Sequence, residues 1–299
     1  MSLINRLVLL LLPIIPKPIV GIFSKPYIAG DSLDDACECV KKLNVQGIMA
    51  TMDLLGESAR HEEDCQSAVE EYFRILDKID REKLDCNISL KPTQLGLLFD
   101  KDLCLRNTRA IAKKAREYNN FVRIDMEDSS CTSDTIEIYS RLREDFDNVG
   151  IAIQAYLRRS LSDVNNLVEK KSNFRLCKGI YIESRDIAYK DPDIINNNFA
   201  FLIEKALKAD SYVGIATHDE KVIWHAQRII DQLDLDTERY EFQMLLGVRE
   251  DLCSILVKAG HRMRTYVPYG KRWYAYCMRR LKENPQIAVY TLKALVGLK

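Results

Sequence analysis

The chain has little of what marks several common protein classes. Lys plus Arg and Asp plus Glu both number 44, so the formal net charge is zero and no excess of positive charge points to a nucleic-acid partner. No Gly-x-Gly occurs in the 299 residues, and the glycine fingerprints of Rossmann folds and P-loops are both absent. The nine cysteines include no Cys-x-x-Cys and the four histidines no His-x-x-x-His. This pattern predicts no metal site, and it predicts free thiols in a reducing compartment.

Long hydrophobic runs are also scarce. The unbroken run from Leu7 to Leu12 is soon ended by prolines, far short of the roughly 20 apolar residues that a membrane-spanning helix needs. Arg6 before this run fits a signal peptide, but no A-x-A-like cleavage site follows. We prefer an N-terminal helical segment over residues 1–44 whose apolar start is buried or lies on a membrane surface. Within it, Gly30-Asp31-Ser32 predicts a capped helix that ends near Leu43.

A repeating rhythm fills the rest of the chain. Amphipathic stretches with helical spacing, such as 58–76 and 102–118, separate short apolar runs of strand length. The runs are Val45–Met52, Asn87–Leu90, Phe121–Asp125, Val149–Tyr156, Phe174–Gly179, Tyr212–His218, Glu241–Leu245 and Met263–Val267. Eight strand–helix units over about 250 residues predict a (β/α)8 TIM barrel at 45–299, and a doubly wound open sheet is the alternative.

Polar side chains gather where these strands end, which is where such barrels place their chemistry. They are Asp53, Glu57, Lys91, Gln94, Asp125, Glu127, Asp128, Gln154, Tyr156, Arg175, Lys178, Tyr181, Thr217, His218, Asp219, Gln243 and Tyr266. Each has an ordinary alternative: Lys91 and Lys178 could be loop lysines, Asp125 a helix cap and His218 a structural histidine. Arg175 is harder to dismiss, because an arginine inside a buried parallel strand needs an anionic or strongly polar partner.

A second polar feature lies near the C-terminus, where a strand end, a Pro/Gly turn and a helix occupy residues 264–285. Tyr276, Arg279, Arg280 and Glu283 fall at i, i+3, i+4 and i+7, so they share one helix face. Two guanidiniums grip a carboxylate well, and such a face is suited to a small zwitterion. A solvated helix face with an i,i+4 ion pair is the alternative.

Several ordered motifs together resemble those of the monofunctional bacterial proline dehydrogenases, flavoenzymes that oxidise L-proline to Δ1-pyrroline-5-carboxylate. The motifs are Asp53–Glu57 (DLLGE), Leu90–Gly96 (LKPTQLG), Arg123–Ser129 (RIDMEDS), Arg175–Tyr181 (RLCKGIY), Ala216–Asp219 (ATHD), Glu241–Leu245 (EFQML) and the Tyr-x-x-Arg-Arg of 276–280. The resemblance runs from about Asp53 to Pro285. It implies a distorted (β/α)8 barrel that binds FAD, which agrees with the strand rhythm and with the missing Rossmann glycines.

The resemblance also implies roles for individual residues. Asp125 and Arg175 would be the catalytic pair, with Arg175 also beside the flavin. Substrate would be bound by Arg279 and Arg280 at the carboxylate with Lys91 beside them, by Tyr266, Tyr276 and Leu245 at the ring, and under a gate formed by Glu57 and Arg279. The flavin would be held by Gln154, Arg175, Lys178, Thr217 and His218, and by the backbone at Met126, Cys177 and Gly179.

Two residues depart from the family pattern: Cys177 stands where valine is more usual, and Ile180 where alanine is common. We expect a cytoplasmic enzyme that passes electrons to a membrane quinone, with peripheral contact at the inner membrane. Two other functions remain open from the residues alone. One is a Schiff-base barrel, such as an aldolase, using Lys91 or Lys178. The other is a binding or regulatory barrel without catalysis.

Overall fold

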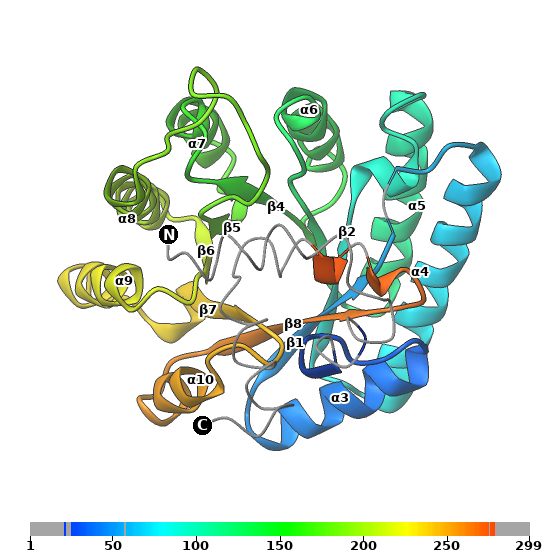
Figure 1. Cartoon of the computed structure of the whole chain (residues 1–299), viewed down its shortest axis with the longest axis horizontal. Coiled ribbons are helices and arrows are strands. Elements are labelled where there is room, and N and C mark those ends of the chain that lie inside the picture. The colour runs from blue at the N-terminus through cyan, green and yellow to red at the C-terminus, as the bar shows by residue number, and fades with distance from the viewer. Residues whose placement is uncertain (1–20, 22–24, 57, 275, 279–299) are drawn as a thin grey trace.

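Eight parallel strands close into a barrel at the centre of the molecule (Figure 1). The computed structural model describes Gly21 and residues 25–56, 58–274 and 276–278. The strands are β1 (Met49–Leu54), β2 (Cys86–Leu90), β3 (Val122–Ile124), β4 (Val149–Gln154), β5 (Asn173–Cys177), β6 (Tyr212–Ala216), β7 (Tyr240–Leu245) and β8 (Met263–Tyr269). Each pairs with the next, and Ala50 of β1 pairs with Thr265 of β8. The predicted (β/α)8 barrel is therefore confirmed, and the open-sheet alternative is wrong.

Helices surround the barrel (Figure 1). They are α3 (Leu33–Val45), α4 (Glu62–Glu82), α5 (Lys101–Glu117), α6 (Thr132–Leu142), α7 (Ser160–Val168), α8 (Pro192–Lys208), α9 (Glu220–Gln232) and α10 (Glu250–Lys258), with short 3-10 turns η2 (Lys25–Tyr27), η3 (Pro92–Leu95) and η4 (Thr237–Arg239). In α4, Tyr72, Ile75, Leu76 and Ile79 recur every three or four residues and are all buried. Each such side chain removed from water stabilises the fold by about 1.5–3 kcal/mol, so the apolar stripe holds α4 against the sheet.

The helix before β1 begins where the sequence predicts. Ser32 and Asp35 form a capping box, in which each side chain accepts a hydrogen bond from the other's backbone N–H. Ala36, Cys37 and Val40 of α3 are buried, and the helix packs on β1 and β8. In Figure 1 it lies between α10 and α4, the place in the outer ring that a helix following β8 would take. The boundary at residues 44 and 45 between helical segment and barrel stays a prediction.

The inside of the barrel is lined by charged and polar side chains as well as apolar ones. Arg264 Nε lies 2.7 Å from Glu241 Oε1, and the Gln243 side-chain amide donates to the same oxygen at 2.5 Å. Gly214 makes room for this arrangement, since a Cβ there would overlap the Gln243 amide nitrogen. Burial raises the pKa of Glu241, but the charge of Arg264 and hydrogen bonds from Arg264, Tyr212 and Gln243 outweigh it and lower the pKa to about 2.

Two further observations concern the cysteines and the helices. All nine cysteines are free thiols, as predicted. In the part of the chain that the structure describes, no helix combines the length and the apolar character needed to cross a membrane. The apolar run at Leu7–Leu12, on which the expected membrane-surface helix depends, lies outside the described residues.

Candidate active site

A cavity of about 490 Å³ opens at the carboxyl ends of the barrel strands. Its lining is Lys91, Asp125, Met126, Glu127, Ala152, Gln154, Arg175, Cys177, Lys178, Gly179, Ile180, Tyr181, Ala216, Thr217, His218, Asp219, Gln243, Met244, Leu245, Tyr266 and Tyr276. This volume falls in the roughly 300–1,000 Å³ range of small-molecule and cofactor sites. Every described residue to which the family resemblance gives a role lines this cavity, whereas the strand-end candidates Asp53, Gln94, Asp128 and Tyr156 do not. Glu57, Arg279 and Arg280 lie outside the described residues.

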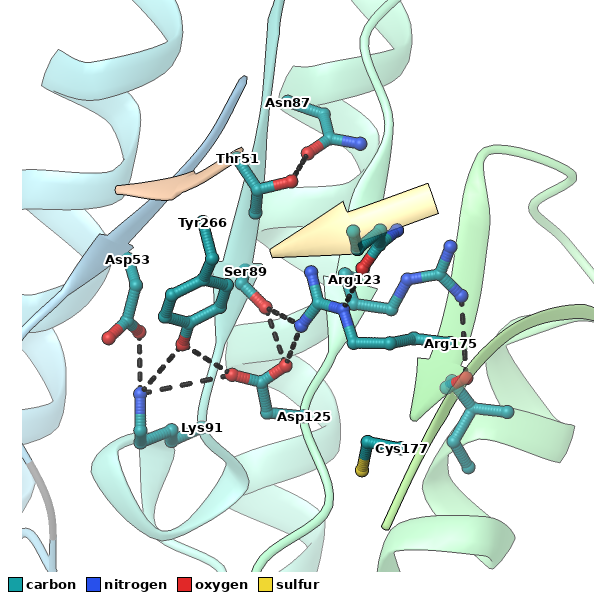
Figure 2. Close-up of polar contacts among 12 residues, drawn as sticks. Thr51, Asp53, Asn87, Ser89, Lys91, Arg123, Asp125, Arg175, Cys177 and Tyr266 are labelled. Atoms are coloured by element: carbon teal, nitrogen blue, oxygen red, sulfur yellow. Dashed lines mark hydrogen bonds and ion pairs between the residues drawn. The ribbon is translucent and has the colours of Figure 1, made fainter. Parts of the chain in front are cut away.

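Asp125 lies at the centre of the polar network in Figure 2. It follows β3, and its backbone N–H donates to Leu90 O at 2.9 Å, which fixes the strand end beside β2. Its Oδ1 accepts from Ser89 Oγ at 2.6 Å and from Arg175 Nη1 at 2.5 Å, while Oδ2 accepts from the Tyr266 hydroxyl at 2.8 Å. Side chains from three strands, β2, β5 and β8, thus donate to one carboxylate, whose position is fixed from several sides.

Arg175 has the anionic partner that its mid-strand position requires. Beyond the ion pair with Asp125, its Nε donates to Gln243 Oε1 at 2.7 Å and its Nη1 to Ser89 Oγ at 3.1 Å. Its guanidinium also lies over the Tyr266 ring, 5.1 Å from the ring centre. Because Arg175 is only 7% exposed, these contacts compensate a cation that would be costly to bury alone.

Lys91 lies on the other side of Asp125, and its nearest carboxylate belongs to β1. Lys91 Nζ is 2.5 Å from Asp53 Oδ1, 3.8 Å from Asp125 Oδ2 and 3.4 Å from the Tyr266 hydroxyl (Figure 2). Burial raises the pKa of Asp53; the charge of Lys91 opposes this effect and that of Asp125 adds to it, leaving the pKa above its usual value. Burial, with the charges of Asp125 and Asp53, also raises the pKa of Tyr266 well above its usual value, so its hydroxyl remains a donor.

The β5 and β6 side of the cavity carries a second ion pair. Lys178 Nζ lies 2.6 Å from Asp219 Oδ2, and Asn196 donates to the same oxygen at 3.1 Å. Burial raises the pKa of Asp219, but these partners outweigh it and the pKa is lowered. Beside Lys178, Gly179 has φ +108°, and a Cβ there would overlap the Tyr156 ring, so only glycine suits this turn.

Two polar side chains of the cavity are fixed by backbone groups. The Gln154 amide donates to Glu127 O at 2.7 Å, and His218 Nε2 accepts from Leu245 N–H at 2.9 Å. Of the two departures from the family pattern, Cys177 lies in the cavity wall and Ile180, 39% exposed, lies at the rim. Fixed donors and acceptors around a partly apolar cavity are suited to orienting a bound ring system.

Sequence reasoning missed part of the site. Ala152, Ala216 and Met244 line the cavity but carry no polar signal, and Ser89 holds Asp125 from inside β2. Asp53 was recognised only as a polar strand end. The two-residue alternation of a strand places Thr51 and Asp53 on one side of β1, and both bond across to β2, so that signal could have found it.

Comparisons with known proteins agree with one another. A family model described as proline dehydrogenase matches residues 36–291. "Proline dehydrogenase 1" of Bacillus subtilis subsp. natto is 38% identical over 273 residues, covering 91% of this chain and 90% of the relative. "Proline dehydrogenase" of Deinococcus radiodurans is 34% identical over 90% of this chain and 89% of its own.

A solved structure is similar as well. The crystal structure of proline utilization A (PutA) from Bdellovibrio bacteriovorus, inactivated by N-propargylglycine, superposes with a TM-score of 0.85 at 26% identity. The match covers 94% of this chain and 36% of that protein.

Proposed function

The chain belongs to the proline dehydrogenase family, and from this premise we propose that it is an FAD-dependent enzyme that oxidises L-proline to Δ1-pyrroline-5-carboxylate and passes the electrons to quinone. Membership makes it an oxidoreductase that acts on a CH–NH bond. The observation that carries the finer proposal is the convergence of Asp125, Arg175, Lys91 and Tyr266 at a cavity in the size range of small-molecule and cofactor sites.

The cavity is compatible with a flavin on its own chemistry. Lys178 supplies a cation for an anionic diphosphate, and Gln154, Thr217 and His218 offer polar groups for a ring edge. Gly179 also lines the cavity, and because it has no side chain, only its backbone groups can contact a ligand there. We assign cofactor binding to these residues together with Arg175 and the backbone of Met126 and Cys177.

Substrate binding is assigned to a second set of residues of the same cavity. Lys91 lies near the cavity's charged end, and we propose that it meets the proline carboxylate together with Arg279 and Arg280. Tyr266, Tyr276 and Leu245 supply apolar surface for the ring. Glu57 and Arg279 are proposed as a gate, as in the family pattern.

The residues contribute positioning and electrostatics rather than bond-making groups. Bound FAD would supply the acceptor for the hydride that leaves the carbon beside the proline nitrogen. Asp125 holds Arg175 and Tyr266 in fixed positions, so the charge and the ring that face the ligand need no reorganisation during the reaction. The Ser89 hydroxyl and the Gln243 amide complete this support from below.

The geometry speaks against a Schiff-base enzyme. An attacking lysine must be neutral, and a close carboxylate favours the charged ammonium. Lys91 is paired with Asp53 and Lys178 with Asp219, at 2.5 and 2.6 Å. Both lysines are therefore better suited to binding anions than to nucleophilic attack.

Quinone reduction and membrane contact rest on the sequence. The apolar run Leu7–Leu12 is too short to span a bilayer and suits an interfacial position. We propose that this segment brings the enzyme to the cytoplasmic side of the inner membrane, where quinone is dissolved. Co-sedimentation with vesicles, compared between the full chain and a chain lacking residues 1–12, tests this part separately.

The main test is an absorbance measurement on the purified protein. Flavin bands that are bleached without oxygen by L-proline, but not by D-proline, are the expected result. Bleaching followed by recovery on adding a soluble quinone analogue extends the test to the acceptor. Protein that purifies with bound flavin yet keeps its bands in excess L-proline would contradict the proposal, and so would borohydride trapping of substrate on Lys91 or Lys178.

A further inference from the structure

Asp53 is buried below the cavity and has no place in the chemistry described so far. It is 0% exposed and does not line the cavity, whereas Lys91 does. Its Oδ1 lies 2.5 Å from Lys91 Nζ, while its Oδ2 finds no hydrogen-bond partner among the residues that the structure describes. Burying a carboxylate that has one oxygen without a hydrogen-bond partner costs folding free energy, so the contact of Asp53 with Lys91 calls for an explanation.

The second carboxylate near Lys91 does not provide the same contact. Asp125 is engaged by Ser89, Arg175 and Tyr266, and lies 3.8 Å from Lys91 Nζ against 2.5 Å for Asp53. Each carboxylate is thus paired with a different cation: Asp125 with Arg175, and Asp53 with Lys91. Without Asp53, the ammonium would be drawn to Asp125, where it would compete with Arg175 and Tyr266.

We propose that Asp53 is a positioning residue for substrate, which acts through Lys91 by holding its ammonium charged and aimed at the proline carboxylate. This inference rests on the proposed function. Asp53 does not touch the substrate; it prevents Lys91 from turning toward Asp125 and keeps a cation where one face of the carboxylate must lie.

Asp53→Asn keeps the side-chain volume and removes the charge. We expect KM for L-proline to rise roughly tenfold or more, because one partner of a buried charged contact is lost, with kcat falling by a smaller factor. Thr51 lies two residues before Asp53 on the same strand, and Thr51→Val is the matched control. This change removes the hydrogen bond to Asn87 without changing a charge. The control should lower stability and leave KM near the wild-type value.

A pH profile separates positioning from a structural effect. Among the residues that the structure describes, the charged and titratable groups beside Lys91 include Asp53 from β1, Asp125 after β3 and Tyr266 from β8, with Arg175 of β5 behind Asp125. Removing the nearest negative charge favours the neutral amine of a buried lysine. In Asp53→Asn, affinity for tetrahydrofuran-2-carboxylate, which has the ring and carboxylate but no amine, should therefore decline with rising pH at a lower pH than in wild type. The change in flavin absorbance on binding reports this affinity without turnover.

A double-mutant cycle decides the case. If Asp53 acts through Lys91, the KM of Asp53→Asn/Lys91→Met equals that of Lys91→Met alone. An equal rise in KM from Asp53→Asn with and without Lys91 would overturn the proposal, as would a wild-type KM and pH profile for Asp53→Asn. If Asp53→Asn does not fold, Asp53→Ser replaces it in the cycle. A wild-type flavin that L-proline does not bleach would instead refute the proposed function, so the two failures are distinguishable.

Discussion

Replacing Arg175 with alanine should cost a large part of the fold's stability. The change removes the guanidinium that lies 2.5 Å from Asp125 and 2.7 Å from Gln243, and it leaves a partly buried carboxylate without its nearest counter-charge. Breaking a buried ion pair from one side costs about 3–5 kcal/mol. Asp125 keeps bonds from Ser89 and Tyr266, and Lys91 can move closer, so we expect about 3 kcal/mol.

Urea unfolding of Arg175→Ala, Asp125→Asn and the double variant measures this energy. Both variants at residue 175 contain the same cavity, so the cycle isolates the charge interaction, for which about 1–3 kcal/mol of coupling is expected. The double variant should be more stable than the sum of the two single losses predicts. A coupling energy near zero would show that Asp125 does not depend on Arg175, and the description of this network would be wrong.

The same variant tests the cofactor role. If Arg175 faces the flavin, its loss should reduce bound FAD or lower the reduction potential by roughly 30–60 mV, the equivalent of about 1.5–3 kcal/mol for one charged hydrogen bond in a two-electron couple. Arg264→Ala is the control, because this buried arginine is paired with Glu241 and does not line the cavity. It should lose stability without a change in potential. Wild-type flavin content and potential in Arg175→Ala would remove Arg175 from the cofactor site.

Three further outcomes are expected. Arg279→Met or Arg280→Met should raise KM for proline strongly while the flavin stays bound, since loss of a charge-assisted carboxylate contact costs about 2–5 kcal/mol. If steady-state kinetics show an unchanged KM in both variants, these arginines do not bind the proline carboxylate. Wild type should prefer proline to trans-4-hydroxy-L-proline by about ten- to a hundredfold in kcat/KM, because the full aromatic ring of Tyr266 is proposed to pack on the substrate ring and would leave the added hydroxyl little room and mostly apolar surface. Tyr266→Ser should narrow that ratio, and an unmoved ratio would place the preference elsewhere. Because the pKa of Glu241 is depressed in the folded protein, its ionisation should stabilise the fold by about 3 kcal/mol above pH 4.5, and this stabilisation should be lost as pH falls toward 2. The urea midpoint of Glu241→Gln should therefore depend less on pH in that window than the midpoint of wild type does. Equal pH slopes for the two proteins would contradict the prediction.

The strand pattern could be predicted because each barrel strand is a short apolar run between amphipathic helices. The ends were less certain. The run Val45–Met52 was predicted as one strand, but Val45 ends α3 and Gly47, at φ +74°, forms the turn before β1 begins at Met49. At the other end, β8 extends past Val267 to Tyr269, because Asp53–Pro268 and Leu54–Tyr269 continue its pairing with β1. The pairing of β1 with β8 decides where these strands begin and end, and this pairing cannot be inferred from one apolar run of the sequence.

Which residues reach the site could be predicted better than which of their side chains contact one another. Listing polar residues at strand ends identifies what reaches the mouth of a barrel, since parallel strands end at one face. It does not tell which side chains meet. The contacts of Lys91 with Asp53 and of Arg175 with Gln243 depend on side-chain length, on the shear of the strands and on the space left by Gly214. The charge of Arg175 predicted that an anion was needed, but not that Asp125 would supply it.

The placement of α3 has a consequence for how the protein is made. A ribosome releases α3 and β1 long before β8, yet α3 packs on both strands and β1 must pair with β8. More than two hundred residues therefore emerge before the barrel can close, with the edge of β1 and the apolar side of α3 waiting for their partner. Such distant pairing makes closure slow and leaves edges open to wrong association meanwhile. During synthesis, the newly made chain should thus depend on chaperones longest at the β1–β8 seam.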